Sequence, residues 1–348
     1  MIGGSVSYFI FSQPDDKPLK AKNAAIVQAA PTVIAEDLQI PWSIQKLNDT
    51  FYLSERLGSI VKVENGQITR QKVNVEKTLS DVSEAGLLGF ILDPNFQENQ
   101  QAYAYYTYDN NGAPFNRVVI LTLQDEVWSE TKLLLDGIPS GQVHHGGRLK
   151  IGPDDKLYIT AGDASDPENA QNLQTLAGKI LRMNLDGSIP SDNPFPNSYI
   201  YSYGHRNPQG LAWDEEGTLY ESEHGQSAHD EINRIQAGMN YGWPIIQGNE
   251  KQQGMETPIF QTGDVTWAPS GIAYHDGKLY VATLRGEALR EVDLATKKSR
   301  ELITGLGRIR DVLIDGEYVY FISNNTDGRG NPAPNDDKLF QIRLSELK

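Results

Sequence analysis

Arginine side chains that can bind carboxylates recur through the second half of this chain. Arg206 lies in a Gly-His-Arg-Asn-Pro segment, and Arg285 lies in a later Leu-Arg-Gly segment. Arg308 and Arg310 form an Arg-Ile-Arg sequence, whose outer side chains point to the same side if the segment is a strand. A guanidinium group stays charged and presents a planar fork of donors that matches a carboxylate. Since the whole chain carries a formal charge of −15, these cations predict a pocket for an anionic ligand, with salt bridges on an acidic surface as the alternative.

Two histidines and an aspartate form a candidate acid–base pair. His144 and His145 precede Gly146 and Gly147, and Asp163 ends a Thr-Ala-Gly-Asp segment one hairpin later. Imidazole has the side-chain pKa nearest neutrality, so it can take a proton from an alcohol. An aspartate at the end of the neighbouring strand would hold the second ring nitrogen and stabilise the imidazolium. A surface loop or a weak metal site is the alternative for such a histidine pair.

Acidic residues near glycine form a candidate cation site. Glu221, Glu223 and Gly225 lie in one short segment, and Glu231 and Tyr241 follow it. Carboxylates and exposed backbone carbonyls suit calcium, a hard cation that takes six to eight oxygen ligands. The spacing is not that of an EF-hand, so solvated acidic loops are the alternative.

The composition restricts the class of protein. The chain has 348 residues, 39% of them hydrophobic, with 32 Gly and 18 Pro, which indicates a globular, turn-rich protein with a large core. Its pI near 4.9 argues against nucleic acid as a partner and against general binding to anionic membranes. The absence of cysteine excludes disulfides, thiolate metal sites and cysteine nucleophiles.

The first 30 residues differ from the rest. Residues 2–10 are apolar but too few to span a bilayer, and residues 14–30 are polar and alanine-rich. We interpret residues 1–30 as the remnant of an export or anchor segment plus a linker, with an N-terminal strand as the alternative. The expected location is therefore extracytoplasmic: secreted, periplasmic or anchored at the cell surface. Stable membrane insertion of the remaining domain, residues 31–348, is not expected.

A repeated pattern along the chain predicts the elements that position these residues. An apolar strand, an Asp/Gly/Asn turn and a strand carrying an aromatic residue recur, which is a hairpin signal. Six copies occur, at residues 48–53, 92–105, 149–159, 211–220, 272–281 and 312–320. Helix signals are weak, and residues 173–181 are the best candidate. The repeat predicts an all-β fold, a six-bladed β-propeller of four-stranded antiparallel blades, rather than a β-sandwich.

These segments, in this order, resemble the soluble pyrroloquinoline-quinone (PQQ)-dependent glucose and aldose sugar dehydrogenase family, and are closer to its aldose branch. The resemblance runs from about Pro41 to the C-terminus. The matching segments are residues 86–90, 144–163, 178–190, 204–210, 223–225, 230–233, 240–244 and 308–311. The resemblance implies a six-bladed propeller that binds PQQ and calcium.

The resemblance also implies a role for each matching residue. His144 is expected to be the general base, Asp163 its partner, and Arg206 a group that stabilises charge during the reaction. The residues expected to bind the quinone are Glu84, Arg206, Asn207, His224, Leu284, Arg285, Arg308 and Arg310. Those expected to bind calcium are Gly225 and Gln226 at the cofactor, and Glu231 and Tyr241 at a second site.

The implied reaction is oxidation of an aldose at the anomeric carbon to a lactone, by hydride transfer to the quinone. The expected partners are the aldose and a separate electron acceptor, and the protein is expected to be a monomer or a homodimer. Glu84 stands where the glucose enzymes carry glutamine, Arg285 replaces lysine, and Gln226 replaces proline. The changes at Glu84 and Arg285 motivate one alternative, a redox-inactive carbohydrate-binding propeller that acts as a recognition module. A calcium-dependent lactonase-type hydrolase is another, although the arginine cluster argues against it.

Overall fold

The computed structural model describes residues 30–347. The predicted export or anchor remnant therefore lies outside the described residues, apart from Ala30. The described part is almost entirely β-sheet, as predicted. Its helical elements are α1 (Phe96–Asn99), α2 (Glu168–Gln171) and the short 3-10 helix η1 (Leu344–Glu346). The predicted helix at residues 173–181 is wrong, because these residues form turns that lead into strand β12 (Lys179–Asn184).

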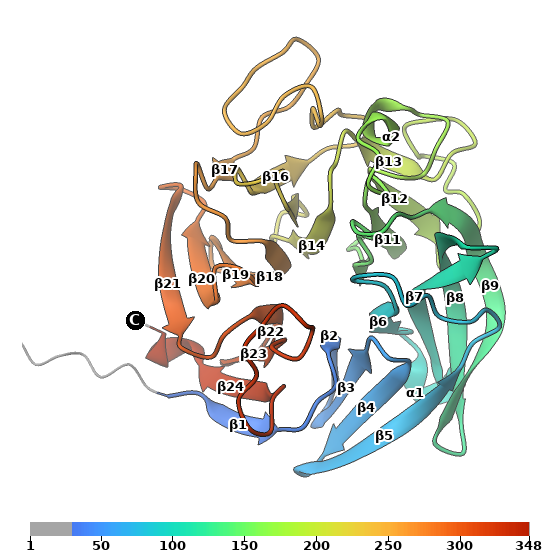
Figure 1. The fold of residues 1–348 in the computed structure, drawn as a ribbon, viewed down its shortest axis with the longest axis vertical. Coiled ribbons are helices and arrows are strands. Elements are labelled where there is room, and N and C mark those ends of the chain that lie inside the picture. Colours follow the sequence, from blue (N-terminus) through green and yellow to red (C-terminus); the bar gives the residue numbers. More distant parts are fainter. Residues whose placement is uncertain (1–29, 348) are drawn as a thin grey trace, which may run out of the picture.

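The strands form four four-stranded antiparallel sheets and one eight-stranded sheet, arranged as a ring around a central axis (Figure 1). The eight-stranded sheet contains β2 (Pro41–Leu47), β3 (Thr50–Glu55), β4 (Ser59–Glu64), β5 (Gln67–Asn74), β6 (Leu87–Leu92), β7 (Gln101–Asn110), β8 (Ala113–Gln124) and β9 (Val127–Pro139). It consists of two antiparallel halves, β2–β5 and β6–β9, which a short parallel pairing of β5 with β9 joins. This ring of sheets is a β-propeller rather than a sandwich.

The remaining sheets follow in chain order around the ring. The first contains β10 (Leu149–Ile151), β11 (Lys156–Ala161), β12 and β13 (Ile200–Tyr203). The second contains β14 (Pro208–Trp213), β15 (Leu219–Glu223), β16 (Glu231–Ile235) and β17 (Phe260–Gln261). The third contains β18 (Pro269–His275), β19 (Lys278–Thr283), β20 (Ala288–Asp293) and β21 (Lys298–Thr304). The last contains β22 (Ile309–Asp315), β23 (Tyr318–Ser323), β24 (Leu339–Arg343) and β1 (Thr32–Ala35).

The strand β1 closes the ring by pairing with the last strand of the chain. Thr32 lies opposite Gln341 and Val33 opposite Phe340 in an antiparallel register. In Figure 1 the blue β1 lies along the red β24. The last sheet is therefore built from both ends of the described chain, which leaves β24 paired on both sides.

All six predicted hairpins are present, and each forms the first two strands of a four-stranded unit. They are the pairs β2–β3, β6–β7, β10–β11, β14–β15, β18–β19 and β22–β23. The hydrophobic core lies mainly between neighbouring units. One cluster joins Leu88 and Tyr105 of one unit to Leu149 and Leu181 of the next. Packing of this kind holds the loops at the sheet ends in place relative to one another.

Glycines on the inner strands allow the backbones near the axis to approach closely. Gly210 in β14 lies against the backbone of Ser270, and Gly271 in β18 lies against Asp311. A Cβ atom on Gly271 would lie 2.8 Å from the Asp311 Cα, closer than real side chains tolerate. The inner strands can therefore converge only because these side chains are absent.

Replacing Gly271 with alanine should lower the free energy of unfolding by about 1–3 kcal/mol, because the inner strands must separate to admit the methyl group. Urea unfolding followed by tryptophan fluorescence would measure the change. Gly316→Asn is the matched control, since Gly316 lies at a turn with φ of 57° and no neighbour within 4 Å. Asparagine tolerates that backbone conformation, so the control should change stability by less than about 0.5 kcal/mol. Equal effects at the two positions would contradict the close-packing argument.

Candidate active site

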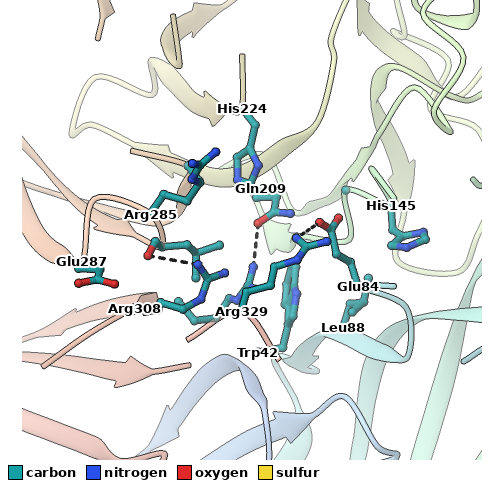
Figure 2. Close-up of a pocket in the computed structure, with 14 residues that line it drawn as sticks. Trp42, Glu84, Leu88, His145, Gln209, His224, Arg285, Glu287, Arg308 and Arg329 are labelled. Atoms are coloured by element: carbon teal, nitrogen blue, oxygen red, sulfur yellow. Dashed lines mark hydrogen bonds and ion pairs between the residues drawn. The ribbon is translucent and has the colours of Figure 1, made fainter. Parts of the chain in front are cut away.

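A cavity of about 390 Å³ opens between loops of several sheets and carries four arginines. The residues that line it are Trp42, Glu84, Leu88, His145, Gly146, Gln209, His224, Ala268, Leu284, Arg285, Glu287, Arg308, Arg310 and Arg329. In Figure 2 the side chains of Arg308, Arg329, Gln209 and Glu84 converge on one space, and Trp42 stands at its edge. The predicted residues Glu84, His224, Leu284, Arg285, Arg308 and Arg310 therefore meet in one cavity.

Arg308 and Arg310 are the buried cations of this cavity, each 5% exposed. Arg308 directly precedes β22 and Arg310 is its second residue, and both side chains line the cavity. Arg308 Nη2 lies 2.8 Å from Asp327 Oδ2. Arg310 instead donates to the neutral oxygens of Gln209 Oε1 and Asn324 Oδ1, each at 2.9 Å. Its ion pair with Asp327 is long, 3.9 Å from Nη2 to Oδ2, and that oxygen lies closer to Arg308, so the charge of Arg310 is only weakly neutralised by the protein.

The electrostatics of Arg310 reflect this burial. Burial, and next the neighbouring charge of Arg308, lower the pKa of Arg310 to about 9. Asp311, the next residue, does not offset it, because its Oδ2 accepts from Arg148 Nη1 at 2.9 Å and from the backbone N–H of Ile44. An anionic ligand would supply the missing negative charge.

Arg329 is a cavity residue that our sequence analysis missed. It lies in the loop between β23 and β24, and its guanidinium donates to Glu84 Oε1 and to Ser83 Oγ. Burial would raise the pKa of Glu84, but the Arg329 charge overcomes this effect and holds the pKa at about 2. An arginine in the glycine-flanked Asp-Gly-Arg-Gly segment of a loop that breaks the repeat was the available signal.

The His144–Asp163 pair lies beside this cavity. His144 Nδ1 lies 2.8 Å from Asp163 Oδ1, so the predicted contact is confirmed. The backbone N–H of His144 donates to Glu84 Oε2 at 3.3 Å, which joins the pair to the cavity wall. Asp163 is 1% exposed, whereas His144 is half-buried. The adjacent His145 lines the cavity, and its ring contacts Ser140 Oγ and the backbone oxygen of Ser83.

Arg206 lines a second, smaller cavity next to the first. This cavity of about 20 Å³ is lined by Arg206, Glu223, His224, Gly225, His229, Glu231, Tyr241, Trp243, Ile246 and Gln247. His224 lines both cavities, so the predicted group of arginines is divided between two adjoining spaces. Burial lowers the pKa of His224 to about 3, so this ring is neutral at pH 7.

Three buried nitrogens of the Arg206, Asn207 and His224 side chains lack a protein partner. They are Arg206 Nε, Asn207 Nδ2 and His224 Nε2. Asn207 is fully buried, and its Oδ1 accepts from the backbone N–H of Gly146 at 3.0 Å. Buried polar groups are normally satisfied, so these atoms mark a place where a polar ligand fits.

The predicted calcium ligands are only partly gathered. Gly225, Glu231 and Tyr241 line the smaller cavity, whereas Gln226 is exposed and lines neither cavity. Within residues 30–347 the group whose possible ligand atoms all lie within 4.8 Å of one another is His205, Glu221 and Glu223.

The surroundings of this group disfavour ionisation of its Glu221 carboxyl group and of the nearby Glu231. Burial, and next the Glu223 charge, raise the pKa of Glu221 well above its usual value. The same two causes raise the pKa of Glu231 to about 8. Asn233 Nδ2 donates to all three carboxylates at 3.2–3.4 Å, and Glu221 Oε1 has no partner. A bound cation would favour the ionised form of each carboxyl group.

The described residues include no helix long and apolar enough to cross a membrane.

The fold and the site define a β-propeller with a cationic ligand cavity and an adjoining histidine–aspartate pair. The model of the glucose/sorbosone dehydrogenase family matches residues 38–331, and the chain belongs to this family. The resemblance predicted from the sequence is confirmed.

Curated relatives have consistent names. Quinoprotein glucose dehydrogenase B of Acinetobacter calcoaceticus is 36% identical over 241 residues, which cover 60% of this chain and half of that protein. Aldose sugar dehydrogenase YliI of Escherichia coli is 29% identical over 361 residues, which cover 89% of this chain and 95% of that protein. The match to the Acinetobacter protein therefore spans much less of the relative than the match to YliI does.

Two solved structures resemble this chain closely. The PQQ-bound form of aldose sugar dehydrogenase from Streptomyces coelicolor has a TM-score of 0.84 and 35% identity, covering 90% of this chain and 96% of that one. The apo-form of the soluble aldose sugar dehydrogenase from Escherichia coli has a TM-score of 0.79 and 27% identity, covering 90% and 99%. The fold of these sugar dehydrogenases is shared along nearly the whole described chain.

The ion pair between Glu84 and Arg329 gives a testable dependence of stability on pH. A carboxyl group whose pKa is lowered on folding stabilises the folded state above its usual pKa of 4.5, and this contribution is lost as the pH falls towards 2. Burial raises the pKa of Glu84, and Arg329→Gln removes the largest effect that opposes burial, so the pKa of Glu84 rises in this variant. We expect the variant to be less stable than the wild type at pH 7, and the difference to shrink as the pH falls from 7 to 4.

Thermal unfolding at several pH values would measure this difference. Arg343→Gln is the matched control, because Arg343 and its partner Glu317 are both more than half exposed. An exposed pair of this kind contributes little, so the control should track the wild type at every pH. A stability difference for Arg329→Gln that is equal at pH 7 and pH 4 would contradict the assignment.

Proposed function

We propose that this protein is a PQQ- and calcium-dependent aldose sugar dehydrogenase, which oxidises the anomeric carbon of an aldose to give a lactone. The observation that carries the proposal is the cavity where Arg285, Arg308, Arg310 and Arg329 meet beside the His144–Asp163 pair. The membership of this chain in the glucose/sorbosone dehydrogenase family, and its similarity to the PQQ-bound form of the Streptomyces relative, support the proposal. The abundance of arginine around the cavity favours this reaction over a lactonase, which would need a metal lined by carboxylates and asparagine.

The cavity fits an anionic quinone in size and in donor chemistry. Its volume of about 390 Å³ lies within the usual range for ligand pockets. Arg285, Arg308 and Arg310 would bind the carboxylates of PQQ, and Leu284 would pack on its ring. The unpartnered nitrogens of Arg206, Asn207 and His224 would donate to its oxygens. Glu84, neutralised by Arg329, would line the same space without repelling the cofactor.

The smaller cavity and the exposed residue Gln226 next to it offer oxygen ligands for calcium. We propose that backbone oxygens of Gly225 and Gln226 hold one calcium ion at the cofactor, and that Glu231 and Tyr241 contribute to a second site. Carboxylate and carbonyl oxygens are the ligands that calcium prefers. The raised pKa of Glu231 supports a bound cation there, because a cation removes the energetic penalty of ionising it.

The mechanism follows from the placement of the chain's own groups. His144 takes the proton of the anomeric hydroxyl as the C–O bond of that carbon gains double-bond character. Asp163, in contact with His144 Nδ1, stabilises the imidazolium that results. The Arg206 guanidinium stabilises the negative charge that develops on the hydride acceptor as the sugar is oxidised. The quinone, when bound, supplies the two-electron acceptor for the hydride that leaves the anomeric carbon.

We further propose the finer architecture and setting. The parallel pairing of β5 with β9 divides the eight-stranded sheet into two blades, which supports a six-bladed propeller of four-stranded antiparallel blades over residues 31–348.

The proposed location is extracytoplasmic, on the basis of the apolar stretch at residues 2–10. A separate electron acceptor reoxidises the cofactor, and the protein acts as a monomer or a homodimer.

Replacing His144 with alanine should lower kcat for aldose oxidation by a factor of about 10²–10⁴, because the proton acceptor is lost. Binding of PQQ, followed by the absorbance of the bound quinone, should stay within about twofold of wild type. His275→Ala is the control, since His275 is exposed at the end of β18. Wild-type kcat in His144→Ala would reject the assigned base.

Replacing Arg310 with glutamine should weaken PQQ binding at least about tenfold, since one charge-assisted hydrogen bond in a buried site is lost. Absorbance titration of metal-depleted protein, with and without added calcium, would measure the effect. Calcium should tighten PQQ binding to the wild-type protein. Arg300→Gln is the control, because Arg300 lies on the outer strand β21, paired with Glu291. Equal quinone affinity in wild type and Arg310→Gln would argue against the cavity as the cofactor site.

A further inference from the structure

Trp243 contacts both halves of the proposed catalytic apparatus. Its indole Nε1 donates to Asp163 Oδ2 at 2.9 Å. The guanidinium carbon of Arg206 lies 5.4 Å from the centre of the Trp243 ring, within the range of a cation–π interaction. One side chain, from the loop that follows β16, therefore lies between the partner of the proposed base and the proposed charge-stabilising arginine.

The hydrogen bond from Trp243 provides a donor for the second oxygen of the Asp163 carboxylate. Asp163 Oδ1 contacts His144 Nδ1 at 2.8 Å and accepts from the backbone N–H of Ser165 at 2.9 Å. Asp163 Oδ2 is bound by the indole N–H instead. A donor on each oxygen prevents rotation of the carboxylate, so Oδ1 stays directed at His144.

Trp243 is itself held by the segment that carries Arg206. Its backbone N–H donates to the carbonyl of Gly204 at 3.0 Å, and its carbonyl accepts from Gln171 Nε2 at 2.6 Å. The backbone N–H of Asp163 donates to the carbonyl of Arg206 at 2.8 Å. The positions of Arg206, Trp243 and Asp163 are thus linked by hydrogen bonds between two neighbouring sheets.

We propose that Trp243 is a positioning residue that aligns the Asp163 carboxylate with His144 and holds Arg206 at the same site. The proposal rests on the proposed sugar oxidation. A neutral donor suits this place, because an arginine or lysine there would neutralise Asp163 and weaken its stabilisation of the imidazolium. The indole N–H orients the carboxylate and leaves its charge intact.

Trp243→Phe separates the two contacts, because it keeps a ring beneath Arg206 and removes the N–H that binds Asp163. We expect kcat to fall about tenfold, the factor that corresponds to roughly one hydrogen bond. KM for the sugar and the affinity for PQQ should stay within about twofold of wild type. The thermal unfolding midpoint of each variant would be measured alongside, so that a loss of folding is recognised.

A second readout does not depend on activity. In ¹⁵N-histidine-labelled protein without quinone or sugar, NMR would follow the Nδ1 proton of His144, whose resonance reports its hydrogen bond to Asp163. We expect this resonance to shift or broaden in Trp243→Phe. Trp128→Phe is the matched control: it also removes an indole N–H bonded to a side-chain oxygen, Gln71 Oε1 at 2.8 Å, away from the site. It should leave the resonance and kcat unchanged.

The outcomes separate this proposal from the proposed function. A shifted His144 resonance in Trp243→Phe, with no oxidation of any aldose by the wild type, would reject the activity and keep the positioning role. An active wild type with unchanged resonance and unchanged kcat in Trp243→Phe would overturn the positioning role. Equal losses of kcat in Trp243→Phe and Trp128→Phe would overturn it too, since they would indicate a general loss of stability.

Discussion

Positive charge buried with incomplete neutralisation is the constraint on which the site depends. Transfer of a charged group from water into a protein is costly unless it gains partners. Arg308 has Asp327 as a close partner, whereas Arg310 reaches the same carboxylate only at 3.9 Å and donates to neutral oxygens. Burial, and next the charge of Arg308, lower the pKa of Arg310. A fold that retains this guanidinium in its interior is suited to a ligand that brings negative charge. The incompletely neutralised charge therefore favours the binding of an anion, whatever individual contacts that anion makes.

The propeller supplies the rigidity that such a cavity requires. Its hydrophobic clusters lie between neighbouring units, so each sheet is held by the ones beside it. Glycines such as Gly210 and Gly271 let the inner strands approach one another closely. The loops that leave these strands therefore begin from well-defined positions. Groups separated by more than a hundred residues, such as Gln209 and Arg310, can then hydrogen-bond across the centre.

The sequence predicted the local parts of this structure well and the contacts between sheets less well. Turn residues and alternating apolar residues are local signals, and all six hairpins were recovered from them. The contact of His144 with Asp163 was also predictable, because a single hairpin separates them. Arg329 and Trp243 were missed, since their partners Glu84 and Asp163 lie on distant segments. Spacing along the chain does not determine which loops meet across a ring. The sequence therefore did not predict that Arg206 lines a separate cavity.

Pairing of β1 with β24 has a consequence for the order in which the molecule is assembled. Thr32 emerges from the ribosome long before Gln341, the residue opposite it in the last sheet. Until then β1 has no neighbour, and contacts so distant along the chain form slowly because of the entropy of loop closure. The ring can therefore close only after β24 has been synthesised. A nascent chain halted short of β24 would expose an open strand edge, which makes such intermediates targets for chaperones.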